Sequence, residues 1–360
     1  MKDYGVDYFR VDTVKHVDST TWAALKNSTT EVNPSFKMIG EYYGAGYASN
    51  GSTLGSGQMD ADLDFDFNDQ ATSFVSGNIS SVEKFLSARN SALNNTYMTG
   101  QFLSSHDEDG FKAALMKGKG YTKDEATSAA LVAATLQAKG IPVIYYGEEV
   151  GLSGLNNYPY QTNRYDMDFN LATDDNVTYQ HYKNLLSIRN AYTDVFARGS
   201  RTVVAGSDEE GYDVVSRSYG GTTLYVGMNI KDTVKEVKVP VSLAAGTEVK
   251  DLYSGATYTV GSDKTVAVTI PAAKDGGTVI LTEVKKTVDP TPADPGKKDP
   301  TPTPVKKDGV ISVTDKAAIE TKKAAPKSGD DNEAATYVCL LGLAMVAITA
   351  ATYRKKKACK

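Results

Sequence analysis

Residues 5–16 read GVDYFRVDTVKH, a short run of mainly apolar residues that reaches an acid at Asp12. Alternate residues of a strand share one face, so Arg10 and Asp12 are predicted to point the same way. A helical pattern follows at about residues 19–29. A strand followed by a helix is the start of a βα unit. In parallel α/β folds the carboxyl end of each strand, where Asp12 lies, is where active sites form.

The same alternation continues to about residue 200. Further strands are predicted at residues 37–41, 62–67, 99–103 and 141–146, and helices near residues 82–92, 123–138 and 179–191. Five strands that alternate with helices predict a parallel sheet with crossover helices.

From residue 201 the pattern changes to short segments of alternating apolar and polar residues. They are predicted at residues 213–218, 222–228, 236–239, 249–252, 266–270 and 278–281. Turn residues such as Gly220-Gly221 and Ser254-Gly255 separate them. This spacing is typical of an antiparallel β-sandwich.

The C-terminal part has the composition of a surface anchor. Residues 289–323 are rich in Pro, Thr, Lys and Asp, which favours an extended spacer. Residues 334–353 carry no charge and are long enough to cross a bilayer, and the basic run 354–357 directly after them would stay in the cytoplasm. The folded part is therefore expected outside the cell, after an export signal upstream of Met1.

The stretch Ala325-Pro326-Lys327-Ser328-Gly329 resembles the Leu-Pro-x-Thr-Gly signal of sortase substrates, with Ala in place of Leu and Ser in place of Thr. The resemblance implies sortase and peptidoglycan as partners, and the membrane before processing. The alternative is a plain C-terminal membrane anchor on a polar stalk. The predicted division is 1–200, 201–286, a linker at 287–324 and an anchor at 325–360.

Composition excludes several classes of protein. The chain has 360 residues and a formal net charge of −5, with no basic stripe in its folded part, which argues against nucleic acid as a partner. Both cysteines, Cys339 and Cys359, lie in the tail, so the folded part has neither a disulfide framework nor a cysteine metal site. The 22 tyrosines suit packing against sugar rings and equally suit β-strands.

Three of the predicted strands lead into acids. An arginine beside Asp12 would keep it ionised, as a nucleophile at an anomeric carbon must be. Glu41 follows Met38-Ile39-Gly40, and partial burial near another carboxylate would let it donate a proton. Asp107 follows His106 after the strand at 99–103. Taken singly, each acid has a structural alternative: an ion pair, a solvated loop residue and a helix N-cap.

Taken together, these segments resemble the α-amylase family, glycoside hydrolase family thirteen. Residues 5–16, Gly40-Glu41 and residues 102–107 are similar to its second, third and fourth conserved regions. Residues 140–151 resemble the last barrel strand and its loop. The resemblance implies an α/β fold: a partial (β/α)₈ TIM barrel with strands 4–8 present, followed by the β-sandwich.

The resemblance also implies the roles of individual residues. Asp12 would be the nucleophile, Glu41 the general acid/base and Asp107 the third carboxylate. Substrate-binding residues would be Arg10, Lys15, His16, His106, Arg164 and Asp168. The backbone carbonyl of His16 is a possible ligand of a structural Ca²⁺. The pair Lys15-His16 favours α-1,4 cleavage inside starch, glycogen or maltooligosaccharide chains.

The family barrel has eight βα units, and the resemblance begins at the fourth. The chain contains no Asp-x₃-Asn-His match to the first conserved region, and the inserted domain with most calcium ligands is also missing. We therefore expect a partial gene whose product, alone, is unstable or inactive. Two other functions stay open: a non-catalytic glucan-binding surface protein derived from this family, and a structural or adhesive wall protein.

Overall fold

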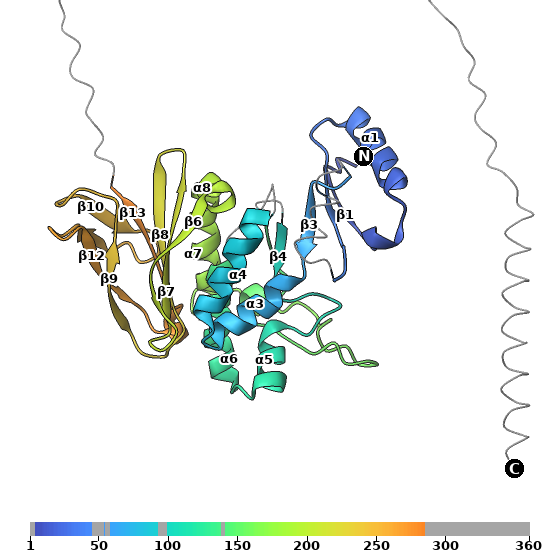
Figure 1. Ribbon diagram of the computed structural model, residues 1–360. Helices are drawn as coiled ribbons and strands as arrows, with labels where there is room; N and C mark the ends of the chain where they lie inside the picture. The colour runs from blue at the N-terminus through green and yellow to red at the C-terminus, as the bar shows by residue number, and fades with distance from the viewer. Residues whose placement is uncertain (1–3, 45–53, 55–57, 93–98, 138–140, 285–360) are drawn as a thin grey trace, which may run out of the picture. The chain divides into compact units, whose positions relative to one another are not determined.

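The computed structural model describes residues 4–44, 54, 58–92, 99–137 and 141–284. Residues 1–289 form one compact unit, which contains the three sheets described below (Figure 1). The predicted linker and anchor, 287–324 and 325–360, lie outside the described residues. Within the described residues, no helix is both long and apolar enough to cross a bilayer.

A five-stranded parallel sheet forms the N-terminal half, which confirms the predicted strand count. Its strands are β1 (Tyr8–Val11), β2 (Lys37–Gly40), β3 (Ala61–Asp64), β4 (Thr99–Phe102) and β5 (Ile141–Val143). They pair in chain order and every pairing is parallel. The carboxyl ends of all five strands therefore meet at one edge, where Asp12 and Glu41 directly follow β1 and β2.

Helices lie between these strands in the chain, and the last two follow β5. They are α1 (Ser19–Val32), α3 (Asp66–Val75), α4 (Ile79–Ala92), α5 (Phe111–Lys119), α6 (Lys123–Gln137), α7 (Val177–Ala191) and α8 (Thr193–Arg198). Short 3₁₀ turns are η1 (Val14–His16), η3 (Glu148–Val150), η4 (Phe169–Leu171) and η5 (Ala273–Asp275). Apolar side chains of α3, α4, α5 and α6 form one buried cluster.

The prediction of a strand at 62–67 is wrong beyond Asp64, because α3 begins at Asp66. The run DLDFDF alternates as a strand does. However, Phe67, Ala71 and Phe74 recur at helical spacing, and all three are buried in the cluster with α6. Because burying these three side chains on one face stabilises a helix, this segment forms a helix and not a strand.

The C-terminal half contains two antiparallel sheets. Six strands pair in the order β11-β10-β13-β8-β7-β6, and two in the order β12-β9. Their bounds are β6 (Ser200–Ser207), β7 (Tyr212–Tyr219), β8 (Thr222–Asn229), β9 (Lys235–Pro240), β10 (Glu248–Asp251), β11 (Thr257–Thr259), β12 (Thr265–Ile270) and β13 (Thr278–Glu283). The strands β6 and β11 were not among the predicted segments. Valines of β9 and β12 share one core with side chains of the larger sheet.

Buried polar contacts join the two halves. The Arg201 guanidinium on β6 pairs with the Glu83 carboxylate on α4, with Nε 2.8 Å from Oε2. Asp213 on β7 is 1% exposed and lies against Glu83. Burial, and next the Glu83 charge, raise the pKa of Asp213 to about 8. The junction therefore holds a protonated carboxyl at neutral pH.

This proton makes the stability depend on pH. In the unfolded chain Asp213 ionises near its usual value of about 3.9, whereas in the folded protein it keeps its proton up to about pH 8. Folding therefore takes up a proton between these values, and its contribution to stability falls as the pH rises through this window.

Asp213→Asn replaces the protonated carboxyl by an amide of the same shape that does not titrate. We expect the variant's unfolding free energy, relative to wild type, to be higher at pH 8 than at pH 5 by more than about 1.4 kcal/mol, the equivalent of one pKa unit. Urea denaturation at the two pH values measures this. If the unfolding free energies of the variant and the wild type differed by the same amount at pH 5 and pH 8, this prediction would be wrong.

Candidate active site

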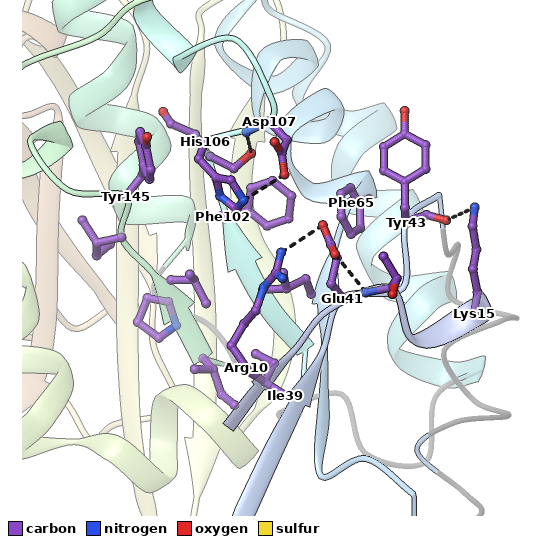
Figure 2. Close-up of a pocket in the computed structure, with 18 of the residues that line it drawn as sticks. Arg10, Lys15, Ile39, Glu41, Tyr43, Phe65, Phe102, His106, Asp107 and Tyr145 are labelled. Carbon is purple, nitrogen blue, oxygen red and sulfur yellow. Dashed lines mark hydrogen bonds and ion pairs between the residues drawn. The ribbon is translucent and has the colours of Figure 1, made fainter. Parts of the chain in front are cut away.

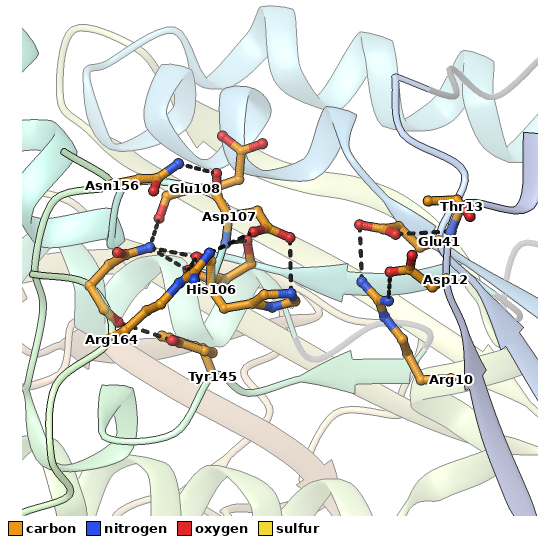
Figure 3. A network of polar contacts seen from close by, with 12 residues as sticks. Arg10, Asp12, Thr13, Glu41, His106, Asp107, Glu108, Tyr145, Asn156 and Arg164 are labelled. Carbon is orange, nitrogen blue, oxygen red and sulfur yellow. Dashed lines mark hydrogen bonds and ion pairs between the residues drawn. The ribbon is translucent and has the colours of Figure 1, made fainter. Parts of the chain in front are cut away.

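Arg10 joins the first two predicted catalytic acids. It lies on β1, and its Nη1 donates to Asp12 Oδ1, while Nη2 lies 3.0 Å from Glu41 Oε1 (Figure 3). Asp12 directly follows β1, and its ion pair with Arg10 agrees with the predicted alternation. One guanidinium thus holds two carboxylates from neighbouring strands together.

The two acids differ in their surroundings. The Asp12 side chain is 67% exposed and the Glu41 side chain only 13%. The hydrogen bond from Arg10, and next the contact with Glu41, lower the pKa of Asp12. Asp12 is therefore ionised and open to an incoming ligand, whereas Glu41 is largely shielded from water.

The turn after β1 fixes Glu41 from the other side. Thr13 has a left-handed backbone with φ 49°, unusual for a β-branched residue, and its N–H donates to Glu41 Oε2 at 3.1 Å. The residue before Glu41 has to be small, because a Cβ on Gly40 would collide with the Asp62 carboxylate on β3. This explains the glycine in the Gly40-Glu41 motif.

A second polar group follows β4. Asp107 Oδ2 lies 2.9 Å from His106 Nε2, and Asp107 Oδ1 lies 3.1 Å from Arg164 Nη2 (Figure 3). Arg164 Nε also donates to the His106 carbonyl oxygen at 3.0 Å. Asp107 is therefore not a helix N-cap: α5 begins at Phe111, and Gly110 is its cap.

Both polar groups border one cavity of about 750 Å³. Figure 2 shows Arg10 and Glu41 on one side and His106 and Asp107 on the other. Asp12 is not among the lining residues and stands at the rim beside Arg10. Apolar side chains from all five strands or the residues after them form the floor: Tyr8, Ile39, Leu63, Phe65, Phe102, Val143 and Tyr145. The cavity thus combines an apolar surface with carboxylates on two sides, a combination of apolar lining and few polar groups that is typical of small-molecule sites.

The other predicted residues divide between the cavity and its surroundings. Lys15 and His16 line it, and Lys15 Nζ donates to the Tyr43 carbonyl oxygen at 2.8 Å and lies 5.0 Å from the Tyr43 ring centre. Asp168 does not line it. Its Oδ1 accepts hydrogen bonds from the N–H and the side-chain amide of Asn170 and caps η4.

Sequence reasoning missed several residues of the site. Tyr43 and Tyr145 line the cavity. Asn156 Nδ2 donates to the Asp107 carbonyl oxygen at 2.7 Å, and Asn163 contacts the same loop. Tyr43 could have been predicted from its position, because it follows the predicted acid Glu41 by only two residues. No local pattern marks the two asparagines.

A structural Ca²⁺ does not fit the described residues by themselves. Among them, no group of three or more His, Cys, Asp or Glu side chains could hold a metal ion. The His16 carbonyl would need ligands from elsewhere, so no step below uses a metal.

Comparisons with known proteins agree with this geometry. Residues 1–178 match the family model described as "Alpha amylase, catalytic domain". The chain is 28% identical over 336 residues to an α-amylase of Streptomyces lividans, a match that covers 82% of this chain and 36% of that protein. It is 22% identical over 276 residues to a cyclomaltodextrinase of Geobacillus thermopakistaniensis, covering 75% of this chain and 44% of that protein. The chain therefore spans less than half the length of these curated relatives.

Solved structures show the same fold. The Geobacillus thermoleovorans α-amylase complexed with acarbose superposes with a TM-score of 0.67 at 20% identity, covering 79% of this chain and 62% of that chain. An Anoxybacillus α-amylase gives a TM-score of 0.65 at 22% identity, and the match covers 79% of this chain and 60% of that chain. The parallel sheet is thus TIM-barrel-like. Its assignment to strands 4–8 stays a prediction.

Proposed function

Residues 1–178 match the α-amylase catalytic-domain family model, and on this premise we propose that the chain is a member of that family and carries the catalytic carboxylates of a retaining glycosidase acting on α-1,4-glucans. The observation that carries the proposal is the bridge from Arg10 to both Asp12 and Glu41 at the edge of a cavity that Asp107 also lines. Its relatives include α-amylases and a cyclomaltodextrinase.

The first step needs an ionised nucleophile and a proton donor. Asp12, held ionised by Arg10, attacks the anomeric carbon, and Glu41 protonates the departing glycosidic oxygen. The bond between the anomeric carbon and that oxygen breaks as a covalent ester to Asp12 forms. A nucleophile and an acid that share one guanidinium suit the short carboxyl separation of retaining enzymes, about 5–5.5 Å.

The second step reverses the proton transfer. Glu41, now a carboxylate, takes a proton from water, and the oxygen of that water replaces Asp12 at the anomeric carbon. Asp107 would stabilise the positive charge that develops on the ring, with His106 and Arg164 holding the carboxylate in place. A sugar hydroxyl in place of water would give transglycosylation.

The cavity surface suits a glucan chain. The rings of Tyr8, Tyr43 and Tyr145 line it, and aromatic rings pack well on the apolar faces of sugars. Lys15 lies beside Tyr43 and His16 lines the same cavity, and both would bind the sugar on the leaving-group side, which favours α-1,4 bonds within chains.

Maltoheptaose hydrolysis tests the proposal. We would assay the chain by itself and the chain extended upstream with the preceding barrel units of the Streptomyces lividans α-amylase, called the complemented chain below. We expect turnover by the complemented chain, with the α-anomer released first as followed by NMR. The absence of hydrolysis by both forms, with maltoheptaose still bound, would favour the non-catalytic glucan-binding alternative.

We also propose that the protein is displayed outside the cell through residues 325–360, which resemble a sorting signal with a membrane anchor. Release of the protein from cell walls by muramidase digestion supports this proposal. Recovery only in the membrane fraction would favour the plain anchor, and recovery only in the cytoplasm would contradict both.

A further inference from the structure

The loop that carries His106 and Asp107 is interlocked with a second segment, residues 153–164. The Gly110 N–H donates to the Gly154 carbonyl oxygen at 2.8 Å. A Cβ on Gly110 would collide with Ser153 Oγ, and a Cβ on Gly154 would collide with the Thr162 carbonyl. The loop therefore packs closely on the second segment at Gly110, and the second segment folds closely on itself at Gly154, with no room for a Cβ at either point.

Asn163 lies at the centre of this contact and is 0% exposed. Its Nδ2 donates to three carbonyl oxygens of the loop, those of Ser105 at 3.2 Å, His106 at 3.0 Å and Glu108 at 2.9 Å. Rotating the amide by half a turn would place Oδ1 against three carbonyl oxygens, so only one orientation is favourable. One side chain thus fixes the backbone on both sides of Asp107.

The backbone of Asn163 is itself held in place. The Asn163 N–H donates to the Leu155 carbonyl oxygen at 3.1 Å, and the Asn163 carbonyl oxygen accepts from the Tyr145 hydroxyl at 3.0 Å. Burial raises the pKa of Tyr145 to about 12, so this hydroxyl keeps its proton at neutral pH. Tyr145 also lines the cavity, which ties Asn163 to the cavity wall.

We propose that Asn163 is a positioning residue, which sets the location of His106 and Asp107 by clamping the backbone that carries them. The proposal rests on the function proposed above. Asn163 reaches no cavity surface and acts only through the loop. A misplacement of about 1 Å at a reacting centre costs about 100-fold in rate, so the clamp matters to catalysis more than to folding.

The chain offers a matched control in Asn229, which is also 0% exposed. Its Nδ2 donates to the carbonyl oxygens of Thr233 at 2.8 Å and Pro271 at 2.9 Å, in the antiparallel half of the molecule. Asn163→Asp and Asn229→Asp each replace an amide donor by a carboxylate of the same shape. Both are expected to destabilise the protein, but only the first disturbs the loop that carries Asp107.

The experiment compares both variants with wild type by maltoheptaose kinetics in the complemented chain and by hydrogen exchange of residues 104–110. For Asn163→Asp we expect kcat to fall about 100-fold with KM changed less than threefold, and exchange of this segment to rise at least tenfold. For Asn229→Asp we expect kcat within threefold of wild type and no change in that segment.

Equal losses of kcat in the two variants, or unchanged exchange of residues 104–110 in Asn163→Asp, would overturn the proposal. If the wild-type protein does not turn over maltoheptaose, the proposed function fails. The exchange comparison then decides separately whether Asn163 holds the loop.

Discussion

Asp12→Asn is expected to lower kcat for maltoheptaose in the complemented chain by at least about 10⁴-fold, the scale of losing a nucleophile. The amide keeps the size of the side chain, but it forms no ester with the anomeric carbon. The Asp12 side chain is 67% exposed, so the substitution opens no buried cavity and should leave the fold intact. Steady-state release of reducing ends measures the effect.

Asp18→Asn is the matched control for this prediction. Asp18 is also an exposed aspartate whose pKa is lowered by hydrogen bonds, in this case from Thr20, and it caps α1 away from the cavity. Asn caps helices about as well as Asp, so kcat should stay within threefold of wild type. If Asp12→Asn retained a tenth of the wild-type rate, Asp12 would not be the nucleophile.

Glu41→Gln is expected to lower kcat for maltoheptaose by about 10²- to 10⁴-fold, the range of general acid catalysis. Gln has the same shape and can still accept the hydrogen bond from the Thr13 N–H, but it transfers no proton. The loss should be much smaller for aryl maltosides with acidic leaving groups, because such groups depart without protonation. Kinetics over a series of leaving groups measures this dependence.

Two observations check the assignment of Glu41. Azide, which attacks the ester to Asp12 without base catalysis, should restore turnover of the aryl substrates by Glu41→Gln. Glu31→Gln, on the exposed face of α1, should leave both substrates unaffected. An equal loss for maltoheptaose and for aryl substrates would mean that Glu41 is not the proton donor.

Local patterns predicted much of the parallel sheet. The five strands, and helices over most of residues 19–32, 79–92, 123–137 and 177–191, follow from apolar periodicity. Alternation through β1 and the residue after it also predicted that Arg10 and Asp12 point the same way, and they form an ion pair. A contact between residues two apart in the chain depends on local geometry alone, so the sequence suffices for it.

Elements with ambiguous periodicity needed the tertiary structure. The run DLDFDF suits a strand, yet only its first half is one, because burial against α6 draws Phe67 and Phe74 into a helix. The strand β6 has mostly half-buried and exposed residues and so carries no clear alternation. Its Arg201 has a buried partner, Glu83, on a distant helix.

The sequence by itself determined the βα order, the residue types at the strand ends and the segments that resemble the α-amylase family. Only the tertiary structure decided that the Arg10 guanidinium reaches Glu41 as well as Asp12, that Arg164 holds Asp107, and that Asn163 clamps the loop around it. The reason is physical: these contacts join residues far apart in the chain. Their geometry depends on how strands and loops pack, which periodicity along the chain does not encode.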